Sequence, residues 1–378
     1  MTPAEQIVHA ALREALAVMD LEARVAAALP DRVRSVNAIA VGKAAPAMMA
    51  GALRRWPIAH ALVITTDGTA LRRDPRVTVL RAGHPLPDAR SVHAAELCLE
   101  LAAEGPLLFL VSGGTSALLC APAPGITLRD KQRVTRALLR GGASIHEINV
   151  VRKHLSRIKG GGLRAVRTLV ASDVLGGAIE DVGSGPSVAS TSRVGTARRI
   201  LARYLPGTEL PLCPRKKATR SPTRIVASPE EHARVLARLL RARLLPPSNA
   251  PVAELAEEYT KHASRLAPGG ALVRAAEPSL EVGVRGRGGR STHLAALVAL
   301  SLPPGVTFCA SASDGVDGSS GTAGAIVDAR LRERWGVEAI TRALAHFETG
   351  PLHLDAGTAL PRRPTGHNLA DVHVLVRR

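Results

Sequence analysis

A glycine-rich segment, Ser112-Gly113-Gly114-Thr115-Ser116, follows an apolar run and precedes a predicted helix. Glycine lets the backbone approach a ligand closely, and N–H groups at a helix start attract anions. The hydroxyl groups add further hydrogen-bond donors. Neither GxxxxGK[ST] nor GxGxxG is present, so a tight turn without a ligand is the alternative. We predict that this segment forms one wall of an active site that binds phosphorylated ligands.

Basic residues elsewhere in the chain could complete an anion site. Lys43 stands just after a predicted strand, in a chain with 7 lysines and 43 arginines. A lysine is a compact charge that can reach a transferring phosphoryl group. Arg152, Lys153 and Lys159 belong to one predicted basic segment that ends in glycines, and one face of it could clamp a carboxylate or phosphate. For each of these residues, a solvated basic surface is the alternative.

Three further segments carry candidate ligand-binding groups in predicted loops. Gly288-Gly289-Arg290 precedes a predicted helix, where a guanidinium suits a phosphate. Asp314 and Asp317 share a Gly/Ser-rich loop, and Asp173 follows another apolar run. Carboxylates of this kind suit Mg²⁺, which usually accompanies nucleotide phosphates. His84, in an Ala-Gly-His-Pro turn, could contact a substrate. Asx turns and a packed loop histidine are the alternatives.

The elements that must position these groups alternate between strand and helix patterns. Apolar runs at 36–42, 59–68, 77–83, 106–114 and 167–174 predict strands, and segments 4–28, 96–105, 126–142 and 145–162 predict helices. In the segment 126–142, Thr127 and Asp130 have the spacing of a capping box, and Gly141 suits the end of the helix. Such alternation indicates βαβ units and a mainly parallel sheet. Ligands of these sheets bind at the carboxyl ends of the strands, where the glycine turns fall.

A Pro-rich, basic segment at 205–224 predicts a domain boundary. The fold class is therefore α/β with two domains, a Rossmann-like domain at 1–222 and a smaller α/β domain at 223–378. In the second domain, 224–228 predicts a strand and 230–245 a helix. Residues 279–302 predict a strand, a glycine loop and a helix, and a strand is predicted from residue 306.

Composition and charge exclude several classes of protein. The 378 residues are 46% apolar, so the chain can bury two cores, and its formal net charge is +18. Residues 187–250 hold 13 basic and 3 acidic side chains, but no aromatic platform interleaves with them, so we do not expect nucleic-acid binding. Four distant cysteines indicate reduced thiols. No signal peptide or membrane span is predicted, and we expect a cytoplasmic protein.

Taken together, these segments resemble the glycerate 2-kinases that combine an N-terminal Rossmann-like domain with a C-terminal MOFRL domain. The resemblance spans nearly the whole chain and is densest in 110–163. The matching stretches are VGKAAPAM (41–48), AGHPLPD (82–88), LVSGGTSALL (110–119), the segment 124–163, SDV and GSGP within 172–186, GRGGR (286–290), SDGVDGSSGTAGA (313–325) and PTGHNLAD (364–371).

This resemblance implies transfer of the γ-phosphoryl group of ATP to the 2-hydroxyl of glycerate, or of a related small hydroxy acid, with Mg²⁺. It implies an active site in a cleft between the domains, where Lys43 and Arg290 match the family's catalytic lysine and arginine. The remaining candidates would bind the nucleotide (Ser112, Gly113, Gly114, Ser116, Lys159, Gly288, Gly289), the hydroxy acid (His84, Arg152, Lys153) and the metal (Asp173, Asp314, Asp317).

The chain departs from the family pattern at several acidic positions. After Asp173-Val174 the family reads Pro-Gly-Asp-Asp, where residues 175–178 are LGGA, and the third Asp expected after Asp317 is Gly321. A relative that binds a nucleotide or small anion with little or no kinase activity is therefore the alternative. Some family members are labelled hydroxypyruvate reductases, but this chain lacks a dinucleotide fingerprint. The preferred hydroxy acid and a homodimer are left open.

Overall fold

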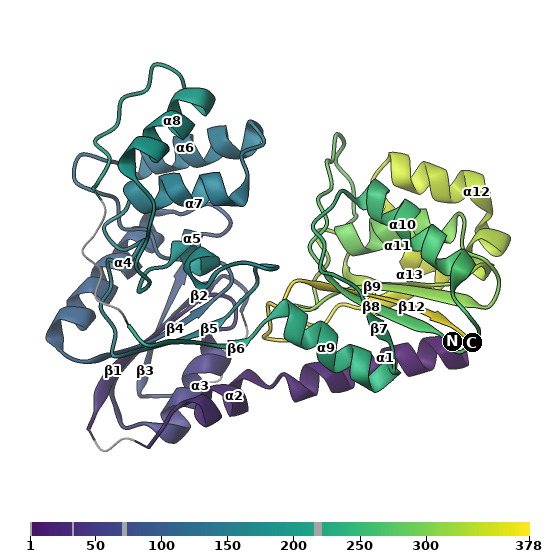
Figure 1. Cartoon of the computed structure of the whole chain (residues 1–378), viewed down its shortest axis with the longest axis horizontal. Coiled ribbons are helices and arrows are strands. Elements are labelled where there is room, and N and C mark those ends of the chain that lie inside the picture. The colour runs from purple at the N-terminus through teal and green to yellow at the C-terminus, as the bar shows by residue number, and fades with distance from the viewer. Residues whose placement is uncertain (1, 32–33, 70–73, 215–220) are drawn as a thin grey trace. The chain divides into compact units, whose positions relative to one another are not determined.

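The computed structural model describes residues 2–31, 34–69, 74–214 and 221–378, and the chain divides into two compact units (Figure 1). The larger unit is Leu21–Ala227, and the smaller unit combines Met1–Asp20 with Ser228–Arg378. Each unit contains its own six-stranded sheet with helices on both faces.

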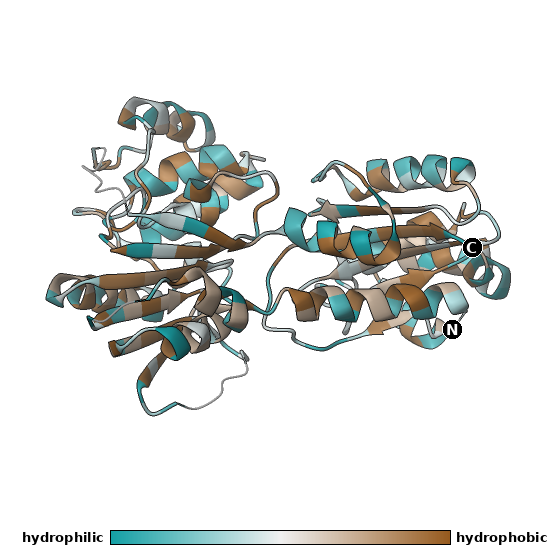
Figure 2. Ribbon diagram, turned by 60° about the horizontal axis from the view of Figure 1, so that its bottom comes forward, coloured by the Kyte–Doolittle hydropathy of each residue, from teal (hydrophilic) through white to brown (hydrophobic). Residues whose placement is uncertain are grey.

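The sheet of the larger unit is parallel throughout, with the strand order β3-β2-β1-β4-β5-β6. Strands β1 and β4 are buried at every position, as expected where helices cover both faces, and much of the central strands is hydrophobic in Figure 2. Because all strands run the same way, their carboxyl ends meet at one edge. The strands are β1 (Val36–Val41), β2 (Ile58–Thr66), β3 (Val77–Ala82), β4 (Leu107–Ser112), β5 (Arg167–Ala171) and β6 (Thr223–Ala227).

Helices cover both faces of this sheet. Helices α2 (Leu21–Ala28) and α3 (Ala45–Arg55) lie on one face, and α4 (Ala89–Glu104) and α5 (Thr115–Leu118) lie on the other. Beyond α5, a separate apolar cluster joins three further helices: α6 (Leu128–Arg140), α7 (Ile145–His154) and α8 (Val194–Tyr204).

Helix α6 begins and ends where the sequence predicts. The Thr127 hydroxyl accepts from the Asp130 N–H at 3.1 Å, and the Asp130 carboxylate accepts from the Thr127 N–H at 3.0 Å. This capping box is confirmed, and Gly141 is the C-cap. In contrast, the helix predicted over 145–162 is too long: α7 ends at His154, and the chain then turns through a glycine run whose Gly160 and Gly161 have positive φ.

The sheet of the smaller unit is mixed, with the order β11-β10-β9-β12-β8-β7. Its strand pairs are antiparallel except for β7 and β8. Helices α1 (Pro3–Val18) and α9 (Pro229–Leu240) lie on one face, and α10 (Val252–Arg265), α11 (Arg290–Ala299), α12 (Arg330–Ala345) and α13 (Thr349–Ala356) pack on the other. The strands are β7 (Arg243–Leu244), β8 (Ala271–Ala276), β9 (Val306–Ala312), β10 (Thr322–Val327), β11 (Ala359–Pro361) and β12 (Asp371–Arg377).

The predicted α/β fold, with a mainly parallel sheet and a second, smaller α/β domain, is confirmed. The compact units nevertheless differ from the predicted division into 1–222 and 223–378. Strand β6 pairs with β5 and so belongs to the larger unit, while α1 packs with α9 in the smaller one. The single helix predicted over 4–28 is two helices, and no strand forms at 279–284, where Val282 and Val284 are exposed. Within the basic segments 205–224 and 187–250, residues 215–220 lie outside the described residues.

In the four described ranges, no helix is long and apolar enough to cross a membrane. All four cysteines carry free thiols, and three of them are buried.

The smaller unit contains a buried histidine, His232. Burial lowers the pKa of His232 to about 4, and within the described residues neither ring nitrogen has a hydrogen-bond partner. The unfolded chain restores a pKa near ~6.5, so it binds more protons than the folded state between these values. We expect the free energy of unfolding to fall by about 2 kcal/mol through His232 alone between pH 7 and pH 5.

The variant His232→Leu should remove this contribution because leucine cannot take up the proton. Urea unfolding at pH 7 and pH 5 measures it. The pH-dependent loss should shrink in His232→Leu and stay unchanged in His346→Gln, since His346 is exposed. An equal loss in wild type and His232→Leu would show that this histidine does not couple folding to protons.

Candidate active site

Two glycine turns meet at the carboxyl ends of β1 and β4. The backbone N–H of Lys43 donates to the carbonyl oxygen of Gly113 at 2.9 Å. The next N–H, of Ala44, donates to the Ser112 hydroxyl at 3.1 Å. The predicted phosphate-binding segment and the predicted catalytic lysine are therefore joined by direct hydrogen bonds.

Glycine is required on both sides of this junction. Gly42 has φ +124°, and an added Cβ would lie 2.1 Å from the Ser112 hydroxyl oxygen. Gly114 has φ +88° and precedes α5, so the chain reverses there without a side chain. A Cβ on Gly114 would lie 3.3 Å from the His84 ring. The structure therefore brings His84 against the same turn.

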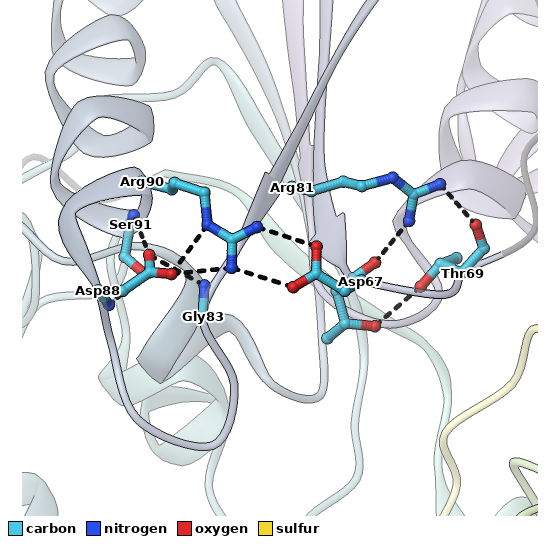
Figure 3. Close-up of polar contacts among 8 residues, drawn as sticks. Asp67, Thr69, Arg81, Gly83, Asp88, Arg90 and Ser91 are labelled. Atoms are coloured by element: carbon cyan, nitrogen blue, oxygen red, sulfur yellow. Dashed lines mark hydrogen bonds and ion pairs between the residues drawn. The ribbon is translucent and has the colours of Figure 1, made fainter.

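An ion-pair network braces the loop that carries His84 (Figure 3). Arg90 of α4 donates to both carboxylate oxygens of Asp67, at 2.9 and 3.0 Å, and to Asp88 at 2.8 Å. Asp88 in turn accepts from the Gly83 N–H at 3.2 Å and caps α4. The loops that follow β2 and β3 are thus tied together. His84 is the residue directly after Gly83 in the second of these loops.

His84 is partly buried near a positive charge. Burial, with a smaller contribution from the Lys43 ammonium, lowers the pKa of its imidazole below the ordinary value. The ring is therefore neutral at pH 7, with one nitrogen able to donate and the other able to accept a hydrogen bond.

Lys159 is buried, with 1% of its surface exposed, at the far end of the glycine-rich segment. Its ammonium donates to the Ser116 hydroxyl at 3.4 Å and to the Gly183 carbonyl at 3.1 Å. The Ser116 hydroxyl also lies 2.9 Å from that of Ser184, which donates to Asn149 at 2.8 Å. The structure therefore brings Lys159 to the predicted anion segment, although α7 ends before it.

The two neighbouring cations on α7 have different surroundings. Lys153 forms an ion pair with Glu180 at 3.6 Å, and Glu180 lies in the short 3₁₀ helix η1 (Ile179–Ser184). Arg152 has neither a hydrogen bond nor an ion pair with any residue that the structure describes. Burial lowers the pKa of its guanidinium, which stays charged at pH 7. Of the two, Arg152 is the better placed to bind an external anion.

In the smaller unit, Asp317 caps the start of α11. Its two carboxylate oxygens accept from the Ser291 N–H at 3.0 Å and from the N–H and hydroxyl of Thr292, both at 2.8 Å. A Cβ on Gly289 would lie 2.1 Å from the carboxylate carbon of Asp317. The N–H groups of Gly288 and Gly289, which were predicted to bind the nucleotide, donate to the Ser319 hydroxyl at 3.2 Å and to the Thr292 hydroxyl at 3.0 Å. Asp317 therefore caps α11, and its role as a metal ligand stays a prediction.

Removing this cap should destabilise the smaller unit. Asp317 is 3% exposed, so Asp317→Ala leaves the N–H groups of Ser291 and Thr292 without an acceptor in the interior, while the Thr292 hydroxyl keeps the Gly289 carbonyl oxygen at 3.2 Å. We expect a loss of about 2–3 kcal/mol in the free energy of unfolding, measured by urea titration. Asp355→Asn, at an exposed position of α13, is the control and should change it by less than about 0.5 kcal/mol. A loss below 1 kcal/mol in Asp317→Ala would argue against the cap.

Arg290 begins α11 and is held between two acids. Its guanidinium donates to Glu277 at 3.3 Å and to Asp371 at 3.4 Å. Asp371 is buried at the start of β12, and burial raises its pKa to about 7 although the Arg290 charge opposes this. Sequence reasoning missed Asp371, whose only signal was its place at the end of the PTGHNLAD stretch. The structure brings Gly288, Gly289, Arg290 and Asp317 together in the smaller unit.

The predicted metal ligands are divided between the two units. Asp173 follows β5 in the larger unit, while Asp314 and Asp317 lie in the smaller unit. Asp314 accepts from the Val316 N–H at 3.0 Å. Across the described parts of the chain, no three His, Cys, Asp or Glu side chains are grouped so that they could hold a metal ion.

Comparison with known proteins gives matches over nearly the whole chain. A family model described as "Domain of unknown function (DUF4147)" matches residues 3–213, and one described as "MOFRL family" matches residues 270–371. A putative hydroxypyruvate reductase from Agrobacterium vitis is 32% identical, over 99% of this chain and 94% of that protein. The D-glycerate 2-kinase of Thermotoga maritima is 30% identical, over 94% of this chain and 96% of that protein.

The fold is similar to that of a solved structure. The crystal structure of a glycerate kinase from Thermotoga maritima matches with a TM-score of 0.88 at 26% identity, and the match covers 99% of each chain.

Proposed function

The chain belongs to the glycerate kinase family of DUF4147 and MOFRL proteins, and from this premise we propose that it phosphorylates glycerate at the 2-hydroxyl with ATP. The observation that carries the proposal is the junction of Lys43 with the Ser112-Gly113-Gly114 segment. It joins the residue that carries this cation to the backbone turn that we assign to phosphate. A related small hydroxy acid would fit the same chemistry.

Catalysis of phosphoryl transfer requires that the protein position the reactants and place positive charge around the transferring group, more than it requires covalent chemistry. We assign the phosphates of the nucleotide to the backbone of the glycine-rich segment, and the charge of the transferring group to Lys43. Neutral His84, against Gly114, can accept a hydrogen bond from the hydroxyl of the acceptor. Lys159 fixes Ser116 and so holds the end of this segment.

The described acids do not fit a dedicated Mg²⁺ site, because Asp317 caps α11 and no three-ligand group is present. Mg²⁺ commonly keeps several waters and binds substrate phosphates with only one or two carboxylates. We therefore propose that it enters as the complex with ATP, and derive no step from protein carboxylates. The catalytic role of Arg290 stays a prediction.

The alternative of an inactive relative is not favoured. Proteins about 30% identical over most of the chain are named as glycerate kinases, including those of Thermotoga maritima and zebrafish. The positions where acids are lost, 177 and 178, are not part of the junction between Lys43 and Gly113, which is intact. A relative from Agrobacterium vitis is named as a putative hydroxypyruvate reductase. This chain has no GxGxxG turn, the dinucleotide-binding motif that would support a reductase.

Steady-state assays of the purified full-length chain test the proposal. ADP release from Mg-ATP should depend on D-glycerate and should be at background with glycerol, which lacks the carboxylate. Hydroxypyruvate should not cause oxidation of NADH or NADPH. If ATP raises the melting temperature while no glycerate-dependent ADP appears, the chain is a nucleotide binder and not this kinase.

A further inference from the structure

The guanidinium of Arg290 lies between two acids that come from neighbouring strands of the smaller unit. Glu277 follows β8, Asp371 begins β12, and these two strands pair. One terminal nitrogen of the guanidinium donates to Glu277 at 3.3 Å, and the other donates to Asp371 at 3.4 Å. Because the guanidinium is a planar, rigid fork, these two contacts together restrict its rotation.

The two acids differ in how firmly they are held. The side chain of Glu277 is 47% exposed, whereas Asp371 is only 2% exposed. An exposed ion pair is weak and is screened by salt. Asp371 belongs instead to a central strand, where it pairs with Ala276 of β8 and with Ala312 of β9. Asp371 is therefore the fixed partner of Arg290, and Glu277 is the adjustable one.

The placement of Asp371 costs stability. The residue before it, Ala370, has φ +56°, in the left-handed region that residues other than glycine rarely adopt. This segment is held by Ser313, whose N–H donates to the Ala370 carbonyl oxygen at 3.1 Å and whose hydroxyl accepts from the Leu369 N–H at 2.7 Å. A buried charge is also costly, and an apolar residue of similar volume often stabilises a core more. Strain and a buried charge at one position indicate a role other than stability.

Arg290 keeps donors that a ligand could use. A guanidinium has five N–H groups, and two of them donate to the acids. Within the residues that the structure describes, the other three have no hydrogen-bond acceptor, and 37% of the side chain is exposed. Arg290 is also the first residue of α11, where the helix dipole favours a negative ligand. The acids can therefore fix the guanidinium while it donates to a phosphate oxygen.

We propose that Asp371 is a positioning residue, which holds the guanidinium of Arg290 in the orientation that stabilises the transferring phosphoryl group. This inference rests on the proposed function and on the predicted catalytic role of Arg290. Asp371 acts through Arg290 and does not itself contact the substrates. The Ser291 hydroxyl lies 3.5 Å from the second carboxylate oxygen of Asp371 and limits rotation of that carboxylate.

The first test is Asp371→Asn, which keeps the shape of the side chain and removes its charge. We expect kcat to fall about 10–100-fold, because a displacement of the guanidinium by about 1 Å weakens its contact in the transition state. KM for ATP and for glycerate should change less than about 3-fold. Kinetics are measured at pH 8.5, above the pKa of about 7 to which burial raises Asp371, so that the wild-type carboxylate is charged. Asp355→Asn, at an exposed position of α13, is the control and should leave kcat and both KM values unchanged.

A double-mutant cycle tests whether Asp371 acts through Arg290. Arg290→Ala should lower kcat by roughly 100-fold or more. Adding Asp371→Asn to this variant should lower kcat by less than about 2-fold further, because the side chain that Asp371 positions is already absent. An equal loss from Asp371→Asn in both backgrounds, together with a lower melting temperature, would assign Asp371 to folding and overturn the proposal.

Arg290→Lys is a second variant that leaves Asp371 in place, and its site is partly exposed, so it should fold. Lysine keeps the charge but lacks the planar fork that spans two acids, and we expect kcat to fall about 10-fold or more. Wild-type kcat in either Arg290→Lys or Asp371→Asn would overturn the positioning role while leaving the kinase intact. Wild type without glycerate-dependent release of ADP would reject the proposed function itself, and this inference with it.

Discussion

Lys43→Ala should lower kcat for glycerate phosphorylation by about 10²–10³-fold, the loss typical of removing one preorganised group that stabilises charge in a transition state. The melting temperature should change little. The hydrogen bond that joins this residue to Gly113 uses the backbone N–H, which alanine retains. Loss of activity without loss of stability is therefore the expected signature, measured by steady-state kinetics and thermal unfolding of the same preparation.

Lys261→Ala serves as the control for Lys43→Ala, because it removes one lysine charge from an exposed surface position. Its kcat should equal that of wild type. A Lys43→Ala enzyme with at least half the wild-type kcat would remove the role that we assign to the ammonium, whatever its stability.

Gly42→Ala should destabilise the larger unit by roughly 3–4 kcal/mol and abolish most activity, since it combines overpacking with a strained backbone. The new Cβ would lie 2.1 Å from the Ser112 hydroxyl oxygen and 2.7 Å from the Ser112 carbonyl oxygen, at a φ of +124°. The turns that hold Lys43 and Gly113 together would have to separate. Urea unfolding and kcat, measured together, follow both effects.

Gly68→Ala is the matched control for Gly42→Ala. Gly68 also has positive φ, at +77°, but an added Cβ would have no atom within 4 Å. It should therefore cost only the backbone strain, about 1 kcal/mol, and leave kcat near the wild-type value. Equal losses in the two variants would mean that the close approach to Ser112 does not matter.

The rule that ligands bind at the carboxyl ends of parallel strands was enough to predict the junction of the two glycine turns. Both turns end apolar runs, and a parallel sheet must bring such ends to one edge. Local sequence patterns were equally reliable where the hydrogen bonds join residues close in sequence, as at the Thr127 capping box. The place of β6 was not predictable in this way, because a strand pattern does not say which of two sheets it joins.

The acidic loop of the smaller unit contains a hydrogen bond that residue type alone does not predict. Asp314 and Asp317, spaced in a Gly/Ser loop, resemble metal ligands in sequence, yet Asp317 turns back onto the start of α11. Asp317 and Thr292 are 25 residues apart in the sequence, so no local sequence pattern predicts the hydrogen bond between them.

The basic residues of α6 and α7 show the same limit. Lys153 and Arg152 are adjacent in sequence and looked equivalent, but only the fold places Glu180 beside the first. Lys131 sits in a helix with many exposed charges, and its burial follows from the packing of α6 on α7. Side chains whose role depends on such tertiary neighbours could not be ranked from the sequence alone.

The ³¹P NMR spectrum of the reaction product tests most directly whether this chain phosphorylates glycerate at the 2-hydroxyl. The purified full-length protein is incubated with Mg-ATP and D-glycerate, and authentic 2- and 3-phosphoglycerate are added afterwards as standards. We expect a new phosphomonoester signal that coincides with 2-phosphoglycerate and is absent with Lys43→Ala over the same time. A signal that coincides with 3-phosphoglycerate, or inorganic phosphate as the sole product beside ADP, would contradict the account.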